Sequence, residues 1–587
     1  MIAQVVFDLP LEGPFDYFIP EHLLHHISVG TRIKASFGAR SMTGFVVALS
    51  PTSAIPSLKP VLSLPDKSPF LNDLDVDFAR EFSAYYGCTL GEALFTSSRN
   101  RDKGTPSVRL DHTPLLNVYA CKPLEYAQKI KEIIGTYQKS MDSKTHRPLR
   151  FLVLVPDVFR LTALAFIFEG IDSVKIGTRS SVFESDARFD AVMMVDEEDP
   201  SYKEEQTPMY ETRQVLLMRA QKFGFDVHFI GLSPSLELMA RVYDNEAKYI
   251  ASQRDDIHKP RLVDLTNYKF VPGLISPPVR DALEAALKAG KPSVLVLNRK
   301  GLYRLIRCTK CAHILKCAHC DTSMIYSRAQ AKFLCRHCTY TLPPNTLCPQ
   351  CQLPSWKFMG IGVEQVQTEL KKIFPQARVA TFERPMKMTA QKTQGLLLPA
   401  FDILIGTQAV LRFQATLKAG VAAFIDFDAE LSRLDMRSAF HAFCLERHIS
   451  AMADQPVFIQ TRNPNHYLLK FLSEGKIQEF YKEELRLRKE FGFSPFKHWV
   501  KISWRGASQK MVQEAAQEVY NKLTESLSDK YVVTPPLSDV VERKRDQFRI
   551  NVMVQAFVVK EAVAFIKSVL GTCKRRGRVI VTLNIDP

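Results

Sequence analysis

Residues 191–199 read Ala-Val-Met-Met-Val-Asp-Glu-Glu-Asp, an uninterrupted apolar run that ends in four consecutive carboxylates. A short apolar run of this kind is typical of a strand buried on both faces, as in a parallel sheet. Helical patterns such as 279–288 and 362–373 lie between many runs of the same type. From about residue 148 the sequence therefore predicts α/β units with a parallel sheet. The other runs cover residues 151–155, 227–230, 293–297, 378–381, 403–405 and 422–425.

Size and charge narrow the class of protein. The 587 residues suffice for roughly three to five domains, and 78 Lys+Arg against 62 Asp+Glu give a formal net charge of +16. This excess favours a polyanionic partner, most often nucleic acid, although a basic enzyme without such a partner is the alternative. No apolar run reaches the roughly 20 residues that span a bilayer, and the N-terminus lacks a basic signal region. We expect a cytoplasmic protein without a membrane partner.

The pattern of apolar and polar residues divides the chain into several domains. Short alternating runs over 1–103 predict a β-rich N-terminal domain, and 104–147 is interpreted as a linker or remnant region. A helical pattern through 468–488 and a later strand–helix alternation predict a C-terminal α+β domain over 466–587. The α/β series between them is interrupted by a cysteine-rich insertion. We assign one lobe to 148–257, a second lobe to 258–302 and 360–465, and the insertion to 303–359.

Eight of the 12 cysteines form four Cys-x-x-Cys pairs between residues 308 and 351. Two residues between thiolates allow one tight turn to present both sulfurs to a tetrahedral zinc ion. Only five residues separate the first pair from the second, whereas 14 separate the second from the third, which is close to zinc-ribbon spacing. The spacing predicts a nested arrangement with two structural Zn²⁺ ions. Cys308, Cys311, Cys348 and Cys351 would hold one ion, and Cys317, Cys320, Cys335 and Cys338 the other.

The carboxylates of residues 196–199 have a functional and a structural interpretation. In a nucleotide-hydrolysing α/β enzyme, Asp196 would hold Mg²⁺ and Glu197 would polarise the attacking water, whereas an acidic loop at a strand end is the alternative. Hydrolysis of this type needs a G-x-x-x-x-G-K-[ST] loop to cradle the phosphates. The Gly-Lys pairs at 290–291 and 475–476 lack both the preceding glycine and the following hydroxyl. The sequence therefore argues against ATP and Mg²⁺ as cofactors and leaves Asp196 and Glu197 as vestigial residues.

Taken together, these features resemble the bacterial replication-restart primosomal protein N′, the PriA helicase family, over nearly the whole chain. The eight-cysteine insertion between two α/β lobes is the most specific element of the resemblance. Other matching stretches are 154–156, Ile176-Gly177-Thr178-Arg179-Ser180, 195–203, Leu297-Asn298-Arg299-Lys300-Gly301, Ile405-Gly406-Thr407-Gln408 and 459–464. The resemblance implies two RecA-like helicase lobes and a protein that remodels stalled forks and reloads the replicative helicase.

The chain also departs from this family. The stretch around 115–125 is unrelated to the family's phosphate-binding loop, and the D-E-E-H box ends in Asp199. Leu232-Ser233-Pro234-Ser235 stands in place of S-A-T-P-S, and 444–454 is unrelated to the family's arginine-finger motif. Losing the phosphate cradle and the arginine fingers together removes ground-state binding and transition-state stabilisation. These departures predict a degenerate member that does not hydrolyse ATP.

The resemblance also implies DNA-binding residues. Phe15, Asp16, Tyr17, Gly38 and Lys59 match the family's pocket for the 3′ end of a nascent strand, where aromatic faces stack a base and Lys reaches a phosphate. An ordinary aromatic core pair is the alternative for Phe15 and Tyr17. Arg179 lies in a matching stretch of the first lobe. The clusters Arg543-Lys544-Arg545 and Lys574-Arg575-Arg576 are interpreted as phosphate contacts, with a solvated basic surface as the alternative. The resemblance implies that the C-terminal domain over 466–587 binds DNA, which favours the phosphate contacts.

The sequence thus predicts a replication restart protein that binds stalled or branched forks bearing a 3′ end and scaffolds primosome assembly at the nucleoid. The expected protein partners are primosome components, the replicative helicase or its loader, and single-strand DNA-binding protein. An active ATP-dependent 3′–5′ DNA helicase with an altered nucleotide pocket is the main alternative. A zinc-ribbon RNA-binding or transcription factor is the third possibility.

Overall fold

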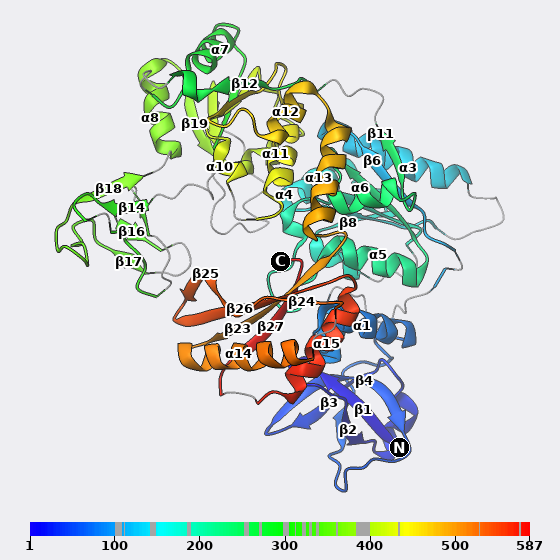
Figure 1. Cartoon of the computed structure of the whole chain (residues 1–587). Coiled ribbons are helices and arrows are strands. Elements are labelled where there is room, and N and C mark those ends of the chain that lie inside the picture. Colours follow the sequence, from blue (N-terminus) through cyan, green and yellow to red (C-terminus); the bar gives the residue numbers. More distant parts are fainter. Residues whose placement is uncertain are drawn as a thin grey trace.

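The structure, a computed structural model, combines an N-terminal β domain, two parallel α/β lobes, a cysteine-rich insertion and a C-terminal α+β domain (Figure 1). The mixed α/β class and the N-terminal β domain are as predicted from the sequence. No helix in the described part of the chain is long and apolar enough to cross a membrane. The described residues are 1–99, 109–110, 112–140, 148–184, 189–251, 257–268, 273–297, 305–311, 313–319, 324–327, 332–335, 340–359, 362–382, 400–432, 435–526, 529–574 and 577–587.

The N-terminal domain is an antiparallel sheet with strand order β2-β1-β4-β3-β5, followed by two helices. The helix α1 begins after Asn72, whose side chain accepts from the Asp75 backbone N–H, and ends at Gly87 in a left-handed conformation. Its elements are β1 (Ile2–Phe7), β2 (Phe15–Phe18), β3 (Arg32–Phe37), β4 (Arg40–Ser50), β5 (Val61–Ser63), α1 (Asp73–Tyr86) and α2 (Leu90–Ser98).

Lobe 1 is a parallel sheet of six strands in the order β11-β6-β10-β9-β7-β8. The strands are β6 (Leu116–Ala120), β7 (Phe151–Leu154), β8 (Val174–Gly177), β9 (Ala191–Val195), β10 (Asp226–Gly231) and β11 (Lys248–Ala251). The helices are α3 (Tyr126–Ser140), α4 (Val158–Ile167), α5 (Thr212–Phe223) and α6 (Leu236–Tyr243).

The prediction of a linker or remnant over 104–147 is corrected by this sheet. Strand β6 lies between β10 and β11, so 116–140 is an integral strand–helix unit of lobe 1. Only Val118 of β6 is fully buried, and the polar side chains of Asn117 and Tyr119 interrupt the apolar run. The strand therefore lacks the continuous hydrophobicity that marks its neighbours in the sequence.

Lobe 2 is a second parallel sheet, in the order β12-β22-β21-β13-β20-β19. Its strands are β12 (Arg261–Asp264), β13 (Ser293–Val296), β19 (Val379–Phe382), β20 (Ile403–Gly406), β21 (Val421–Phe424) and β22 (Phe458–Thr461). Its helices are α7 (Pro277–Lys288), α8 (Val363–Ile373), α10 (Asp428–Leu431), α11 (Ser438–Met452), α12 (Tyr467–Glu474) and α13 (Ile477–Phe491). The helical pattern after 466 is divided at Gly475, which has a left-handed backbone (φ 73°).

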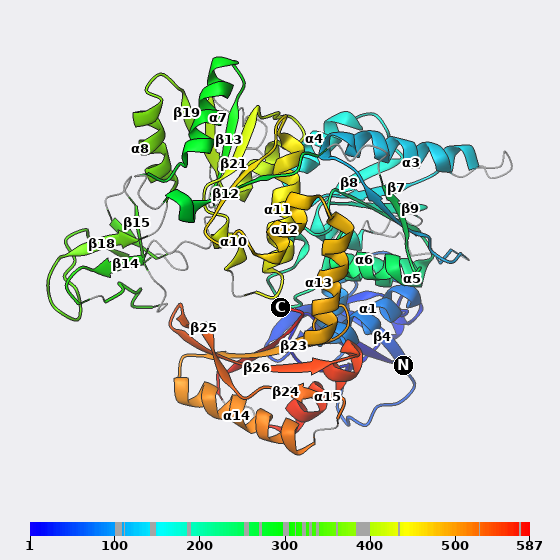
Figure 2. The same cartoon turned by 45° about the horizontal axis from the view of Figure 1, so that its top comes forward.

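The cysteine-rich insertion projects from lobe 2 between β13 and α8 (Figures 1 and 2). It holds a two-stranded and a three-stranded antiparallel sheet. The strands are β14 (Leu305–Cys308), β15 (Ile325–Ser327), β16 (Lys332–Leu334), β17 (Thr341–Leu342) and β18 (Trp356–Met359).

The C-terminal domain is an antiparallel sheet with two helices packed on one face (Figure 2). Strand order is β24-β26-β23-β27, and β25 also pairs with β26. The elements are β23 (His498–Gly506), α14 (Gln509–Glu525), β24 (Val532–Val533), β25 (Leu537–Lys544), β26 (Gln547–Ala556), α15 (Val559–Thr572) and β27 (Ile580–Ile585).

Hydrophobic contacts join the N-terminal domain, the two lobes and the C-terminal domain. A single core cluster contains Phe82 of α1, Met194 of lobe 1 and Trp504 of the C-terminal sheet. A second cluster packs Met239 of α6, in lobe 1, with Tyr481 of α13 and the rest of the lobe 2 core. The domains are therefore fixed against one another by buried apolar surface, which gives most of the stability of a folded chain.

Two helical glycines provide a matched test of this packing. A Cβ at Gly91 of α2 would lie 1.8 Å from the Phe7 carbonyl oxygen, whereas nothing lies within 4 Å of a Cβ at Gly135 of α3. We expect Gly91→Ala to lower the free energy of unfolding by about 2–3 kcal/mol, and Gly135→Ala to raise it by up to about 1 kcal/mol because Ala favours helix. Thermal or urea unfolding measures both. Equal midpoints for the two variants would contradict the close approach of α2 to β1.

Candidate functional sites at the lobe interface, the cysteine cluster and the basic surfaces

The carboxylate box lies at the carboxyl end of β9, where lobe 1 faces lobe 2. Asp196 follows the strand directly in a left-handed conformation (φ 47°), which Asp tolerates better than most residues. Asp196 and Glu197 are 1% and 3% exposed. A buried carboxylate is stable only when hydrogen bonds or cations satisfy its oxygens. The partners of these two side chains therefore decide what the site can do.

Three donors converge on Asp196. The Tyr126 hydroxyl, from the first residue of α3, donates to Oδ1. Arg160 Nη2 of α4 lies 3.2 Å from Oδ2, and Gln414 Nε2 of lobe 2 donates to the same oxygen at 3.2 Å. Burial, together with the Asp196 charge, raises the pKa of Tyr126 well above its usual range, so the phenol remains a donor. Both oxygens of Asp196 are thus engaged by the protein itself.

Tyr126 follows the turn that leads from a parallel strand into a helix. In P-loop proteins the corresponding turn binds the phosphates. Here it consists only of residues 121–125, without a glycine, between β6 and α3. Three of its four backbone N–H groups are already used: Cys121 donates to the Gly231 carbonyl, Lys122 to the Glu125 carboxylate, and Glu125 to the Lys122 carbonyl. Pro123 has no N–H to donate. This turn offers a triphosphate little to bind.

A buried imidazole continues the network across the lobe interface. His448 of α11 places Nε2 3.0 Å from Glu198 Oε1 and Nδ1 2.8 Å from Gln414 Oε1. Burial opposes a charge on His448, but the Glu198 hydrogen bond and the nearby carboxylates outweigh it and raise its pKa. Burial is also the main reason that the pKa of Glu198 rises to about 7. The chain of contacts from Glu198 through His448 and Gln414 to Asp196 connects the two lobes.

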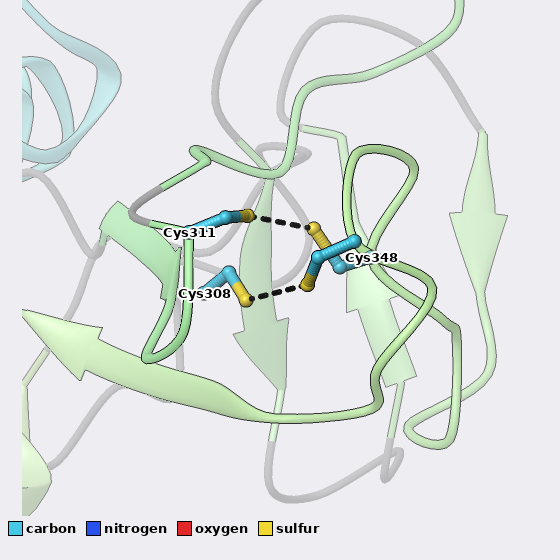
Figure 3. A group of neighbouring side chains, drawn as sticks. Cys308, Cys311 and Cys348 are labelled. Atoms are coloured by element: carbon cyan, nitrogen blue, oxygen red, sulfur yellow. Dashed lines mark hydrogen bonds between the residues drawn. The ribbon is translucent and has the colours of Figure 1, made fainter.

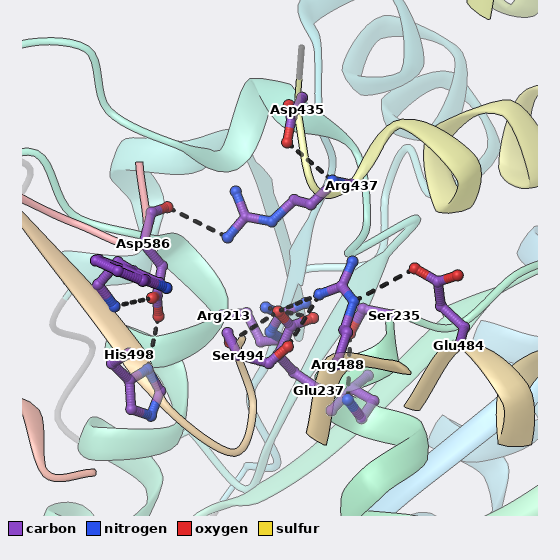
Figure 4. Close-up of polar contacts among 12 residues, drawn as sticks. Arg213, Ser235, Glu237, Asp435, Arg437, Glu484, Arg488, Ser494, His498 and Asp586 are labelled. Carbon is purple, nitrogen blue, oxygen red and sulfur yellow. Dashed lines mark hydrogen bonds and ion pairs between the residues drawn. The ribbon is translucent and has the colours of Figure 1, made fainter. Parts of the chain in front are cut away.

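Glu197, which would polarise water in a hydrolase, is likewise occupied. Its Oε2 lies 2.5 Å from Arg213 Nη1 of α5, and its Oε1 accepts from the Ser235 backbone N–H at 2.6 Å. Arg213 also pairs with Glu237 at 3.5 Å (Figure 4). Burial opposes ionisation of Glu237, but Arg213 and the neighbouring arginines lower its pKa to about 2. Glu197 is therefore a structural ion-pair partner at the start of α6.

A cavity of about 950 Å³ opens beside this ion-pair cluster. It is lined by lobe 1, by α11 and α13, and by the end of the C-terminal domain. His498 Nδ1 lies 2.6 Å from the Asp586 carboxylate, and Arg437 Nη2 donates to the Asp586 carbonyl at 3.2 Å (Figure 4). Lys203 Nζ donates to the Ile585 carbonyl at 2.6 Å. Ile585, the last residue of β27, and the following Asp586 thus bind lobe 1 and lobe 2 at the cavity wall.

Asp196, Glu198 and His448 place ligand atoms within 4.8 Å of one another, a spacing compatible with a metal ion. The donors around them do not fit a cation, because Arg160 already occupies Asp196 and His448 holds both ring nitrogens in hydrogen bonds. An ion here would have to displace these contacts.

The outer cysteine quartet has a geometry that fits zinc. The Sγ atoms of Cys308 and Cys351, and those of Cys311 and Cys348, are 3.5 Å apart (Figure 3). All four sulfurs lie within 4.8 Å of one another. Four thiolates at about 2.3 Å from a tetrahedral zinc ion would be about 3.8 Å apart. The structure brings together the four thiols that the nested pairing assigns to one site.

Of the inner quartet, Cys317 and Cys335 are described and buried in a small core with Phe333. Cys320 and Cys338 lie outside the described residues.

In the N-terminal domain, Asp16 accepts from Gln4 Nε2 at 3.4 Å and from Ser53 Oγ at 2.5 Å. Lys59 Nζ donates to the Gly38 carbonyl at 3.3 Å, and the space beside Gly38 is open. Gly38 has a left-handed backbone (φ 59°), which glycine adopts freely. The Phe18 backbone N–H donates to the Lys59 backbone carbonyl at 3.0 Å, so Lys59 lies beside the end of β2.

Tyr17 is corrected from base-stacking residue to core residue. Its side chain is buried, and its hydroxyl donates to the Ser36 carbonyl at 3.0 Å. Phe15 shares that face and packs on Phe7 and Phe37 at ring distances of 6.2 and 5.0 Å. Because side chains alternate along a strand, Asp16 shares the opposite face with Phe18, which is 46% exposed. Phe18 was missed as a candidate, although this alternation could have indicated it.

The predicted basic contacts are placed in different surroundings. Arg179 donates to the carbonyls of Ser201 and Lys203 and pairs with Glu204 at 2.9 Å, so its charge is used inside lobe 1. Arg543 donates to the Ala318 carbonyl of the insertion, and Arg545 lies in the turn after β25 with Lys544 at the strand end. Lys574 is exposed next to α14, and Arg575 and Arg576 lie outside the described residues.

Several residues of the lobe interface were not predicted. Tyr126, Arg160, Gln414 and His448 are far apart in the sequence and carry no motif. His448 lies within 444–454, the stretch expected to replace the arginine-finger motif. Only the apposition of the lobes identifies these four side chains as partners.

Two parallel α/β lobes meet at a carboxylate-bearing strand end and carry a cysteine-rich insertion and accessory β domains. This is the arrangement that the resemblance to the helicase family predicts. The model of the PriA 3′DNA-binding domain (3′BD) matches residues 4–98. Proteins named Replication restart protein PriA match the chain over its full length, so the chain is similar to this family throughout.

The Treponema pallidum relative is 24% identical, covering 100% of this chain and 99% of its own. The Borreliella burgdorferi relative is 24% identical over 71% of this chain and 64% of its own, and the Bacillus subtilis relative is 25% identical over 70% and 53%. Among solved structures, the Escherichia coli DEAH/RHA helicase HrpB aligns with a TM-score of 0.30 and 10% identity, over 59% of this chain and 40% of its own. Dbp5 of S. cerevisiae aligns with a TM-score of 0.28 and 10% identity, over 64% and 83%.

The raised pKa of Glu198 predicts a pH dependence of stability. Between about pH 4.5 and 7 the folded chain holds a proton that the unfolded chain has released, so this group makes stability fall as pH rises. Glu198→Gln removes this titrating group. As pH rises from 5 to 7, we therefore expect the melting temperature of the variant to increase relative to that of the parent. The exposed Glu525→Gln is the control and should follow the parent. Parallel curves for Glu198→Gln and the parent would contradict the buried pairing with His448.

Proposed function

We propose that this protein binds stalled or branched DNA forks and scaffolds primosome assembly without hydrolysing ATP. The observation that carries the proposal is the occupation of Asp196 by Tyr126, Arg160 and Gln414. These contacts fill the place where a helicase of this class would hold Mg²⁺ and phosphate. The relatives are named replication restart proteins. Their name supports a DNA fork as the substrate class.

The second half of a nucleotide site is also replaced. Helix α11 includes residues 444–452, which by resemblance correspond to the family's arginine-finger motif. Nearly all residues of α11 are buried. It delivers His448 to Glu198 rather than an arginine to open space. Without a cation aimed at a developing phosphate charge, the transition state for phosphoryl transfer loses its main stabilisation. Asp196 and Glu197 act as structural residues in this account.

We assign capture of a DNA 3′ end to the N-terminal sheet, with Asp16, Phe18 and Lys59 as the contacting side chains. A carboxylate can accept from a terminal hydroxyl or base edge, an exposed ring can stack a base, and Lys can reach a phosphate. Phe15 supports this surface from the core, and Gly38 leaves room beside Lys59. The match of 4–98 to the 3′DNA-binding domain model supports this assignment.

The insertion is assigned two structural Zn²⁺ ions. The outer quartet has the geometry described above, and the nested spacing assigns Cys317, Cys320, Cys335 and Cys338 to the inner site. Closed four-thiolate sites have no open position for catalysis, so the ions would supply folding energy to a segment with a small hydrophobic core. Primosome components, the replicative helicase or its loader, and single-strand DNA-binding protein are the proposed partners, in the cytoplasm at the nucleoid.

ATP turnover by the purified full chain tests the scaffold proposal. With and without forked DNA carrying a 3′ end at the branch, we expect turnover no greater than that of Asp196→Asn, and fork affinity unaffected by ATP. Turnover that the fork stimulates and Asp196→Asn abolishes would establish the rival, an active helicase with an altered pocket. Tighter binding to structured RNA than to the fork would refute the fork assignment.

Zinc content tests the metal assignment. We expect two equivalents of zinc per chain by elemental analysis, and one equivalent after Cys348→Ser, because a tetrahedral site loses a ligand. Cys573→Ser, which changes a cysteine outside the insertion, should keep both. Chelation should also alter the emission of Trp356, whose Nε1 donates to the Thr346 carbonyl at 2.7 Å beside the outer quartet. Full zinc content in Cys348→Ser would contradict the outer site.

A further inference from the structure

Two cations at the end of the C-terminal strand contact neutral oxygens instead of carboxylates. Lys203 Nζ donates to the Ile585 carbonyl at 2.6 Å. Arg437 Nη2 donates to the carbonyl of the following residue, Asp586, at 3.2 Å (Figure 4). Neither Lys203 nor Arg437 forms an ion pair with a carboxylate in the part of the chain that the structure describes. The two positive charges therefore hold adjacent peptide groups without a direct counter-charge.

The environment of Lys203 favours the neutral amine. Burial lowers the pKa of Lys203 to about 8, and the charge of Arg437 acts in the same direction although the carboxylate of Glu211 opposes both. This value is close to the pKa of a free α-amino group, about 7.7–8.0. A substantial share of Lys203 is thus uncharged at mildly alkaline pH, and an uncharged amine is a nucleophile.

The surroundings of Lys203 also select the kind of electrophile that can reach it. Lys203 and Arg437 both line the cavity of about 950 Å³ described above, so a small molecule has access to the amine. Eleven Asp and Glu side chains line this cavity against six Lys and Arg side chains, an excess that repels anionic reagents such as acyl phosphates. A small neutral electrophile meets no such barrier. Carbon dioxide is a molecule of this kind.

We propose that Lys203 is a site of carbamate formation with carbon dioxide. The ammonium group first loses one proton to water. The Nζ lone pair then attacks the carbon of CO2, so that an N–C bond forms while one C–O π pair moves onto oxygen. The nitrogen releases a second proton to water. The product is a carbamate that carries one negative charge, and the reaction needs neither a leaving group nor a redox partner.

The carbamate reverses the charge that faces Arg437. Repulsion between two cations becomes attraction between a carboxylate group and a guanidinium, which form charge-assisted hydrogen bonds. The N–H that remains on Nζ can still donate to the Ile585 carbonyl. Lys203 belongs to lobe 1, Arg437 precedes α11 of lobe 2, and Ile585 ends β27. Carbon dioxide therefore strengthens the junction of these three parts. This inference does not depend on the proposed DNA-binding function.

Trapping with triethyloxonium, which converts carbamates into stable ethyl esters, tests the site in the full chain. In bicarbonate buffer at about pH 8, peptide mass spectrometry should find the ester on Lys203 at a level at least about tenfold above that on Lys560, because an exposed lysine stays charged at this pH. Lys560 lines the same cavity and is exposed, so it reports on the access of the reagents. Buffer free of CO2 should give no ester on Lys203.

Two substitutions separate the carbamate from general effects of bicarbonate. Arg437→Gln should lower the amount of ester on Lys203 at least about fivefold, because the carbamate loses its cation. The control Arg280→Gln removes an exposed charge from α7 and should match the parent. Lys203→Arg keeps the positive charge but cannot form a carbamate. At equal ionic strength, replacing chloride by bicarbonate should raise the melting temperature of the parent by about 1–2 °C and leave that of Lys203→Arg unchanged.

Absence of the ester from Lys203 in the folded parent, or equal labelling of Lys203 and Lys560, would overturn the site without any variant. An equal bicarbonate shift of the melting temperature in Lys203→Arg would overturn it as well. An unchanged ester level in Arg437→Gln would refute the pairing with Arg437. None of these measurements involves DNA, so their failure leaves the proposed function standing, and loss of fork binding leaves the carbamate site standing.

Discussion

A carboxylate buried at the end of a parallel strand must be satisfied by its surroundings, and Asp196 is satisfied by side chains from both lobes. Tyr126 and Arg160 approach from lobe 1, and Gln414 from lobe 2. Separating the lobes would leave Asp196 short of one donor and Glu198 without His448. A polar network thus sets the relative position of the lobes. In a motor protein, the nucleotide bound at this place controls how the lobes move.

Other contacts follow from that fixed position. Tyr481 of α13 donates to the Pro234 carbonyl of lobe 1 at 2.8 Å, beside the apolar contact with α6. The C-terminal domain can then hold lobe 1 through Lys203 and the loop before α11 through Arg437. Helix α1 joins the N-terminal sheet to the same core. The N-terminal sheet and the C-terminal domain are therefore held in fixed positions beside the lobes, as the proposed fork-binding function requires.

The sequence indicates some of this architecture and misses the rest for physical reasons. The buried strands of both lobes can be predicted from the sequence because burial on both faces requires continuous apolar runs. The outer cysteine quartet can be predicted because metal-ligand pairs have a fixed local spacing. The sequence does not indicate strand β6 because its half-buried Asn117 and Tyr119 break the apolar run. The resemblance predicts a base-stacking role for Tyr17, but it does not say which face of a strand is buried. Gln414 and His448 could not be found, since their role depends on how two separately folded lobes meet.

Hydrogen exchange across the lobe interface tests the central claim most directly. Peptides covering 121–126 and 442–452 contain the turn that replaces the phosphate cradle and the helix that carries His448. If the polar network holds the lobes together, both segments will exchange slowly, and saturating ATP with Mg²⁺ and fork DNA will leave their exchange unchanged. Protection or opening of these two segments upon addition of ATP would show that the interface still responds to nucleotide, and would contradict the account.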